Sequence, residues 1–206
     1  DEAVVTVPST VVFNNRTFHV TGISNDAFQD HTDLRSVDMP SITYIEDGSN
    51  FVGAFSGCAH LIDVNMPAVE EIGKGTFSNC YSLTSISLPV ATSIGDCAFG
   101  GCDALASISL PAATSIGSGA FWGCGALTSV SLPAATSFGS GAFQGCKTLT
   151  SVSMPVATTI KSGAFSDCSY LCDIYVGDQP AQCDNPFSKV TYATATLHVP
   201  TGCASK

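Results

Sequence analysis

The chain has 206 residues and a net charge of −10 at pH 7, all of it in residues 1–103, which hold 13 of the 17 acidic and three of the seven basic residues. No region gathers Lys or Arg to neutralise phosphates, which disfavours nucleic acid and anionic membrane surfaces as partners. No apolar run approaches the roughly 20 residues of a membrane span, so we expect no membrane insertion by this segment.

Residues 1–22 precede a repeating region and are expected to form an N-terminal cap. The string V-V-F-N-N-R-T-F-H-V predicts two short strands joined at Asn14 and Asn15. We expect this hairpin to cover the open end of the repeats, because an uncapped end would expose apolar side chains and unpaired strand edges. The chain begins at Asp1 rather than Met and has no signal peptide, so we interpret it as a processed or trimmed segment.

A phenylalanine then recurs at a nearly fixed interval, which is 22 residues from the second copy onward. Its positions are Phe28, Phe55, Phe77, Phe99, Phe121, Phe143 and Phe165. Self-similarity at 20–50 residues is typical of solenoids, in which one coil stacks on copies of itself. We therefore expect about seven coils in residues 23–176, and a single elongated domain over residues 1–206, because a solenoid grows by addition.

Each coil predicts two strands and a tight turn. Around Phe121, Ile108 and Leu110 are two apart and point to one face of a strand. Pro111 removes a backbone donor and ends that strand, and T-S-I-G predicts a second, shorter strand. Phe121 and Cys124 are three apart, as expected for one turn of a short helical or 3₁₀ segment with both side chains inward.

The combined string L-x-x-I-x-L-P…I-G-x-x-A-F-x-x-C spans roughly residues 23–176 and resembles the BspA-like class of leucine-rich repeats. The resemblance implies a right-handed, mainly β leucine-rich-repeat solenoid. It also implies a cell-surface or secreted protein, because known members have that location and some adhere to host or matrix proteins. Ala91, Ala113 and Ala135 stand where the commonest leucine-rich repeats have Asn or Cys, so the usual polar ladder should be missing.

Six of the ten cysteines follow the repeat: Cys58, Cys80, Cys102, Cys124, Cys146 and Cys168. Stacked coils hold equivalent Cβ atoms about 4.8 Å apart on parallel vectors, whereas a disulfide requires about 3.8 Å and converging vectors. We therefore predict a ladder of free, buried thiols that pack as small hydrophobes. His31 takes the equivalent place in the first coil.

Four cysteines lie off this ladder. Cys97 stands where other coils have glycine and is interpreted as a tolerated substitution. Cys172, Cys183 and Cys203 fall in the last coil and the C-terminal cap, where a disulfide, for example between Cys183 and Cys203, is one alternative. Zinc at Cys168 and Cys172 is disfavoured, because the former is a core residue and no second matched pair follows. We expect no metal and no cofactor.

Two segments depart from the period. The step from Phe28 to Phe55 is 27 residues, and the extra residues between Ile45 and Ala54 predict a surface loop, with a binding loop as the alternative. Residues 177–206 lose the pattern and are expected to form a C-terminal strand cap, with Leu197 and Val199 on one side of a last strand.

Outward positions of the main strands form columns of serine in the middle coils. They are Ser85, Ser87, Ser107, Ser109, Ser129, Ser131, Ser151 and Ser153. Hydroxyls that hydrogen-bond along the stack are one interpretation, and a flat surface for a glycan or an extended peptide is the other. Candidate binding residues gather where the columns vary: Arg35, Asp38, Asp63, Asn65, Asp173 and Tyr175. Trp122 occupies a variable slot and is expected to be partly exposed, as a contact site or an ordinary surface aromatic.

No catalytic motif is present. Cys58 and His60 are two apart, but the cysteine belongs to the inward ladder, so we expect no thiol–imidazole pair. The leading hypothesis is a non-enzymatic, extracellular or cell-surface interaction module that adheres to a protein or glycan on a host or matrix surface. The alternatives are a structural spacer without a ligand of its own, and an enzyme with an unrecognised site in the caps or the insertion.

Overall fold

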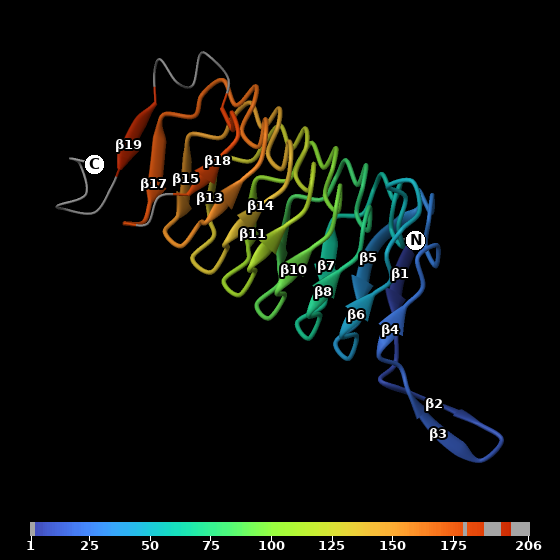
Figure 1. The fold of residues 1–206 in the computed structure, drawn as a ribbon. Helices are drawn as coiled ribbons and strands as arrows, with labels where there is room; N and C mark the ends of the chain where they lie inside the picture. Colours follow the sequence, from blue (N-terminus) through green and yellow to red (C-terminus); the bar gives the residue numbers. More distant parts are fainter. Residues whose placement is uncertain (1–2, 179–180, 188–194, 199–206) are drawn as a thin grey trace.

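The computed structural model describes residues 3–178, 181–187 and 195–198. The chain winds into an elongated stack of coils in which every coil contributes one strand to each of two sheets (Figure 1). No helix occurs among these residues. The A-F-x-x-C segment is a turn of the 3₁₀ kind, in which Cys102 N–H donates to Phe99 O at 3.2 Å and Leu105 N–H donates to Cys102 O at 3.0 Å.

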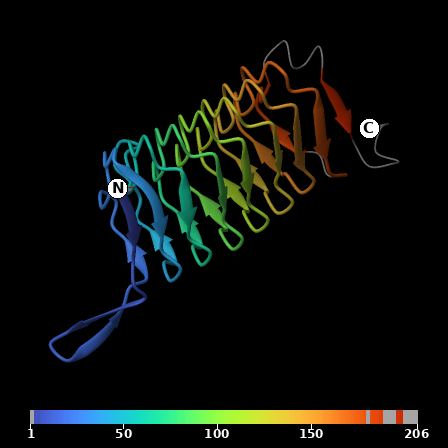
Figure 2. The same cartoon turned by 180° about the vertical axis from the view of Figure 1, so that it is seen from behind.

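The main sheet is built from the longer strands. These are β1 (Ala3–Thr6), β5 (Leu34–Asp38), β7 (Asp63–Asn65), β9 (Ser85–Ser87), β11 (Ser107–Ser109), β13 (Ser129–Ser131), β15 (Ser151–Met154), β17 (Asp173–Val176) and β19 (Thr196–His198). They pair in parallel as β1-β5-β7, β9-β11 and β13-β15-β17-β19. The three groups form one surface, because β7 lies beside β9 and β11 beside β13 (Figures 1 and 2).

The second sheet is built from two-residue strands. These are β4 (Gly22–Ile23), β6 (Tyr44–Ile45), β8 (Glu71–Ile72), β10 (Ser93–Ile94), β12 (Ser115–Ile116), β14 (Ser137–Phe138), β16 (Thr159–Ile160) and β18 (Gln182–Cys183). All eight pair in parallel in chain order. The weaker strand predicted from T-S-I-G is therefore present, and β18 adds an eighth coil beyond the seven expected.

The N-terminal hairpin is present, but its expected position was wrong. Strands β2 (Thr10–Phe13) and β3 (Arg16–His19) pair in antiparallel fashion. Asn14 and Asn15 have φ of 50° and 57°, as a two-residue hairpin turn requires. The hairpin extends away from the stack (Figures 1 and 2). The main-sheet edge is covered instead by β1, because its parallel pairing with β5 satisfies the free backbone groups there.

The core is organised around a continuous stack of phenylalanine rings. Phe55 and Phe77 lie 5.2 Å apart between ring centroids, and Phe99 and Phe121 lie 5.3 Å apart at an interplanar angle of 2°. The stack continues to Phe187, 5.4 Å from Phe165. Phe187 follows Phe165 by 22 residues, a signal the sequence analysis missed because the surrounding D-N-P-F departs from G-A-F. Each ring thus buries its faces against the coils on either side.

The cysteine ladder is confirmed, with a hydrogen bond that the sequence did not predict. Cys102 Sγ donates to Phe77 O of the preceding coil at 3.1 Å, and the same carbonyl accepts Cys80 N–H at 3.2 Å. The other ladder thiols, Cys58, Cys80, Cys124, Cys146 and Cys168, repeat this contact at 3.0–3.2 Å. Each thiol therefore donates to the second lone pair of a buried carbonyl oxygen. The polar ladder of the commonest leucine-rich repeats would satisfy buried backbone groups in the same way.

Burial also makes these thiols poor nucleophiles. Burial raises the pKa of Cys58 to about 11 and that of Cys168 to about 12. Burial raises the pKa of Cys102 well above its ordinary value as well, and the neighbouring ladder thiol Cys80 adds to the shift. Reactive cysteines need a populated thiolate, so the ladder has a packing role.

Cys97 occupies a backbone conformation that suits glycine. Its φ is 52°, and the equivalent Gly119, Gly141 and Gly163 have φ of 60–67°. The residue before each ladder cysteine is also left-handed and is always Gly, Asn or Asp, as at Gly57. These residue types tolerate positive φ best, so Cys97 is a substitution that carries local backbone strain.

Truncating a central ring should cost more stability than truncating an end ring. Phe121→Ala is expected to lower the free energy of unfolding by about 3–5 kcal/mol, because it opens a cavity between two stacked rings. Phe28→Ala should cost about half as much, because Phe28 is half-buried and, among the described rings, stacks face to face on Phe55 alone. Urea unfolding followed by circular dichroism measures both values. If the two variants lost equal free energy of unfolding, this result would contradict the conclusion that contacts between neighbouring coils add up to the stability of the stack.

Thiol accessibility should separate the ladder from the other cysteines. In the folded chain at about pH 8, iodoacetamide should modify the exposed Cys172 and Cys183 and leave Cys102 and Cys124 unmodified, because the buried thiols form no thiolate. Peptide mass spectrometry identifies the alkylated positions, and the urea-unfolded chain, in which all should react, is the control. Modification of Cys124 as fast as Cys172 would disprove the buried ladder.

Candidate functional site

The outward face of the main sheet brings most of the predicted site residues onto one surface. Strand register places Asp63 opposite Ser36 and Asn65 opposite Asp38 at the N-terminal end. At the C-terminal end it places Asp173 opposite Ser151 and Tyr175 opposite Ser153. These residues share the two outward columns of the sheet but form two groups, separated by the coils whose outward residues are serines.

The serine columns present free hydroxyl groups rather than a hydrogen-bonded ladder. Within the described residues no side-chain hydrogen bond joins the outward serines of β9, β11, β13 and β15. The hydroxyl ladder lies in the threonine columns beside them, where Thr150 Oγ1 donates to Thr128 O at 3.0 Å. A similar column before the second sheet has Thr114 Oγ1 donating to Thr92 O at 3.1 Å. The serine face is therefore an uncharged strip whose hydroxyls are available to water or to a ligand.

The N-terminal group is held by one polar contact. Asn65 Nδ2 donates to Asp38 Oδ1 at 2.6 Å across β5 and β7. Asp63 is exposed, and Arg35 is half-buried at the start of β5. No ion pair joins Arg35 to Asp38 or Asp63 in the described structure. The group therefore presents two carboxylates and an amide at the strip's N-terminal end, and Arg35 lies one residue before its outward columns.

The C-terminal group includes a residue that the sequence analysis missed. His198 in β19 lies with Nε2 2.8 Å from Asp173 Oδ1, and its ring stacks on Tyr175 at 4.2 Å. The hydrogen bond from His198 lowers the pKa of Asp173. The sequence feature that could have revealed His198 is the alternation in T-L-H-V, which places His198 on the face of the strand opposite Leu197. Val199, paired with Leu197 in the expectation, lies outside the described residues.

Trp122 stands apart from the main-sheet face. It lies in the turn between β12 and β13, and 53% of the residue is exposed, as expected. The equivalent positions in the adjacent coils are Gly100 and Gln144. The structure therefore does not join Trp122 to the other predicted residues.

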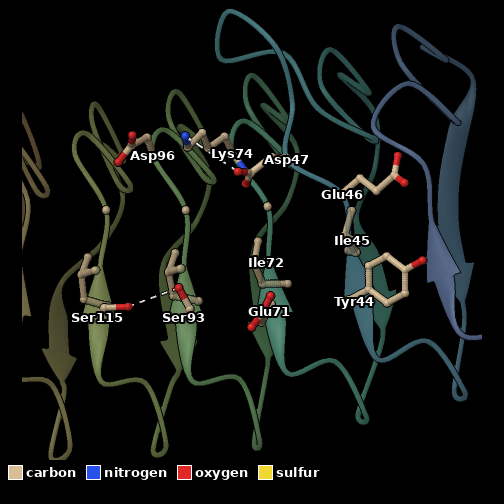
Figure 3. Close-up of a pocket in the computed structure, with 15 residues that line it drawn as sticks. Tyr44, Ile45, Glu46, Asp47, Glu71, Ile72, Lys74, Ser93, Asp96 and Ser115 are labelled. Atoms are coloured by element: carbon tan, nitrogen blue, oxygen red, sulfur yellow. Dashed lines mark hydrogen bonds and ion pairs between the residues drawn. The ribbon is translucent and has the colours of Figure 1, made fainter.

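A groove on the second sheet was not predicted. It encloses about 550 Å³ and runs across β6, β8, β10 and β12 (Figure 3). Its lining includes Tyr44, Glu46, Glu71, Ser93 and Ser115. A glycine column follows the second-sheet strands, and a Cβ at Gly95 or Gly117 would lie 2.7 or 2.6 Å from backbone of the preceding coil. The glycines thus allow close stacking and leave this side of each coil hollow.

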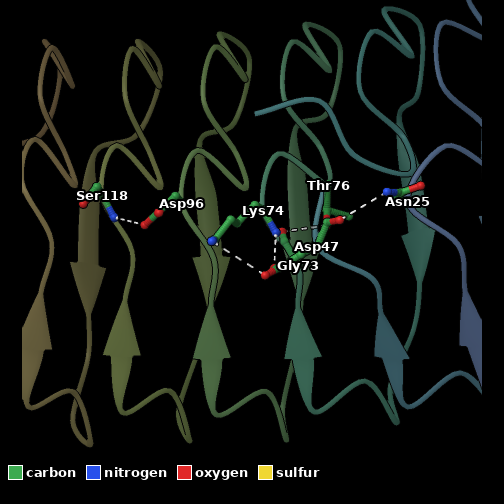
Figure 4. Close-up of polar contacts among 7 residues, drawn as sticks. All are labelled: Asn25, Asp47, Gly73, Lys74, Thr76, Asp96 and Ser118. Atoms are coloured by element: carbon green, nitrogen blue, oxygen red, sulfur yellow. Dashed lines mark hydrogen bonds and ion pairs between the residues drawn. The ribbon is translucent and has the colours of Figure 1, made fainter. Parts of the chain in front are cut away.

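The acidic residues of the groove differ in their partners. Asp47 accepts Lys74 N–H at 3.0 Å and lies 3.7 Å from its Nζ, and Asp96 accepts Ser118 N–H at 2.7 Å (Figure 4). These contacts link successive coils and attach the insertion between Ile45 and Ala54 to the stack. The side-chain carboxylates of Glu46 and Glu71 have no hydrogen-bond or ion-pair partner among the described residues. The N-terminal end of the groove therefore carries uncompensated negative charge.

Cys58 and His60 hydrogen-bond to different backbone carbonyl groups and not to each other. Cys58 Sγ donates to Phe28 O at 3.0 Å, while His60 Nδ1 lies 2.7 Å from Thr32 O. In the part of the chain that the structure describes, no group of three His, Cys, Asp or Glu side chains is arranged to hold a metal. Cys172 and Cys183 are free thiols, and Cys203 lies outside the described residues.

Comparison with known proteins identifies the class of this solenoid. The sequence model of the family described as BspA type leucine-rich repeat region matches this chain over residues 9–93 and 70–188, with six copies of the repeat. The chain belongs to this family. Its repeats are typically non-enzymatic and mediate protein binding.

Two solved structures show the same fold. A leucine-rich repeat protein of T. pallidum is 27% identical with a TM-score of 0.57, and the match covers 92% of this chain and 80% of that one. A leucine-rich cell surface protein of Faecalibacterium prausnitzii is 24% identical with a TM-score of 0.55, over 85% of this chain and 63% of that one. The chain thus spans less than two thirds of the Faecalibacterium protein. No curated protein sequence matches the chain. Across the described residues, no helix has the length and apolar character needed to cross a bilayer.

The contact between Asp173 and His198 should be visible as a pH titration. The folded state lowers the pKa of the Asp173 carboxyl. The contact therefore stabilises β19 fully at pH values above the ordinary carboxyl pKa, and this stabilisation is lost as the pH falls through the lowered pKa. We expect the side-chain carboxyl carbon of Asp173 to titrate by NMR below the ordinary value of about 4.

The variant His198→Ala should move this midpoint upward, because the hydrogen bond that stabilises the carboxylate is removed. His60→Ala is the matched control, since His60 is an exposed histidine bonded elsewhere. An Asp173 midpoint that His198→Ala leaves unchanged would show that the pair does not form in solution.

Proposed function

We propose that this chain is a non-enzymatic interaction module of a cell-surface or secreted protein, and that it adheres to a protein or glycan on a host or matrix surface. The binding surface is the outward face of the main sheet. The observation that carries this proposal is the open, uncharged serine strip with a polar or aromatic group at each end. Membership of the BspA type repeat family supports the interaction role.

The spacing of the two end groups favours an extended ligand. Strands β7 and β17 are five coils apart, or roughly 24 Å at about 4.8 Å per coil. An extended peptide of about seven residues, or a linear glycan of similar length, spans that distance. Asp63 and Asn65 then contact one end, while Tyr175 and Asp173 contact the other. Tyr175 is exposed, and its ring is held in place by His198, so it anchors a ligand at low entropic cost.

A structural spacer is the second candidate. The parallel phenylalanine stack and the uniform serine columns favour it, because both suit a stiff rod whose surface makes no specific contact. The two candidates differ in one consequence. A spacer tolerates bulky substitution on the serine strip, whereas a binding face does not.

Binding experiments on the whole chain distinguish them. The immobilised chain is exposed to a panel of extracellular matrix proteins and host glycans, and each ligand that binds is measured again with variants. Tyr175→Ala and Asp63→Ala should each weaken binding by about tenfold or more, because a truncated interface anchor costs about 2 kcal/mol. Ser109→Arg in the middle of the strip should abolish binding by steric obstruction.

Ser140→Arg is the matched control, since Ser140 is an exposed serine on the other side of the coil, after β14. Trp122→Ala reports on a contact outside the main-sheet face. Unchanged binding in Tyr175→Ala, Asp63→Ala and Ser109→Arg would reject this face as the binding surface. If no member of the panel binds the unchanged chain, the spacer is the better description.

A further inference from the structure

The β2–β3 hairpin exposes an apolar face that the stack does not cover. Cross-strand pairing places Val11 beside Phe18 and Phe13 beside Arg16, so these four side chains share one face. The exposed fractions of Phe13 and Phe18 are 67% and 48%. An isolated two-stranded hairpin is marginally stable in water and gains stability when such a face is buried.

The hairpin also differs in charge from the rest of the molecule. Residues 3–25 contain no Asp or Glu and carry Arg16, while the first half of the chain holds 13 acidic residues. The tip therefore presents a phenyl ring and a guanidinium side by side. A complementary surface would offer an aromatic ring beside unpaired carboxylates.

The N-terminal end of the second-sheet groove has this composition. The Tyr44 ring contacts Gly22 of the first coil, where a Cβ would overlap the tyrosine ring, and Tyr44 is 46% exposed. Glu71 is the lateral neighbour of Tyr44 in the sheet, and Glu46 follows two residues later on the same coil (Figure 3). Neither carboxylate has a hydrogen-bond or ion-pair partner in the described structure, so both are available to a cation.

We propose that the hairpin of one copy binds the groove of a second copy. Phe13 packs on the Tyr44 ring, and Arg16 lies against the carboxylate of Glu71, the lateral neighbour of Tyr44. The hairpin points away from its own stack, so a second copy, rather than the same copy, supplies the groove (Figures 1 and 2). This inference does not use the main-sheet face and stands apart from the proposed function.

The position of both elements favours a closed pair. Strand β3 is followed within three residues by β4, the edge of the second sheet, and β6 with Tyr44 is the next strand in that sheet. Hairpin and groove thus lie at the same end of the molecule. One two-fold axis at that end forms both contacts at once, with each copy supplying one hairpin and one groove.

Sedimentation of the 206-residue chain from micromolar to millimolar concentration tests the proposal. We expect a monomer–dimer equilibrium that weakens as salt is added, because part of the contact is ionic. Arg16→Glu and Glu71→Lys should each weaken dimerisation by about tenfold or more, because each places like charges in contact. The double variant should restore dimerisation, since it recreates the opposite-charge pair with the signs exchanged.

Asp63→Lys is the matched control, because it makes the same change in net charge on the main-sheet face and should leave the dimer intact. Circular dichroism verifies that every variant is folded. A chain that stays monomeric over the whole range would overturn the proposal. A dimer that Arg16→Glu does not weaken, that the double variant does not restore, or that Asp63→Lys weakens equally would overturn it too.

Discussion

The structure depends on contact between successive coils. No coil can bury its own phenylalanine, cysteine and aliphatic side chains, because a 22-residue loop has no interior of its own. The stack provides one: each ring inside the stack lies between two rings, and each ladder thiol donates to a carbonyl of the preceding coil. Backbone hydrogen bonds join the same coils, such as Phe99 N–H to Ala120 O at 2.7 Å. Removing one layer therefore weakens both of its neighbours.

This constraint also explains why the surfaces are so regular. Since every inward position is occupied by packing, variation is confined to outward positions and to the ends of the stack. The serine strip, the threonine ladders and the glycine-lined groove are all consequences of copying one coil. Chemical distinction arises where the copying fails, as at Asp38 and Asn65, at Tyr175 and His198, and at Tyr44 and Glu71.

The ends differ in how they close the stack. At the N-terminus β1 covers the edge of the main sheet, which leaves the hairpin free to project. At the C-terminus β19 covers β17, and the pair of Asp173 and His198 joins the two strands on the solvent face. Both ends therefore combine a capping strand with side chains available for contacts with other molecules.

The sequence by itself determined the repeat, the inward side chains and the free thiol ladder, because period and alternation are local properties of the chain. It also predicted the hairpin turn at Asn14 and Asn15, since that turn depends on residue type. Only the tertiary structure decided where the hairpin lies, that Phe187 extends the ring stack, and that His198 meets Asp173. The groove beside Tyr44 and Glu71 was equally hidden, because it results from several coils lying side by side. Such contacts join residues more than 20 positions apart, and their geometry exists only after the coils have stacked.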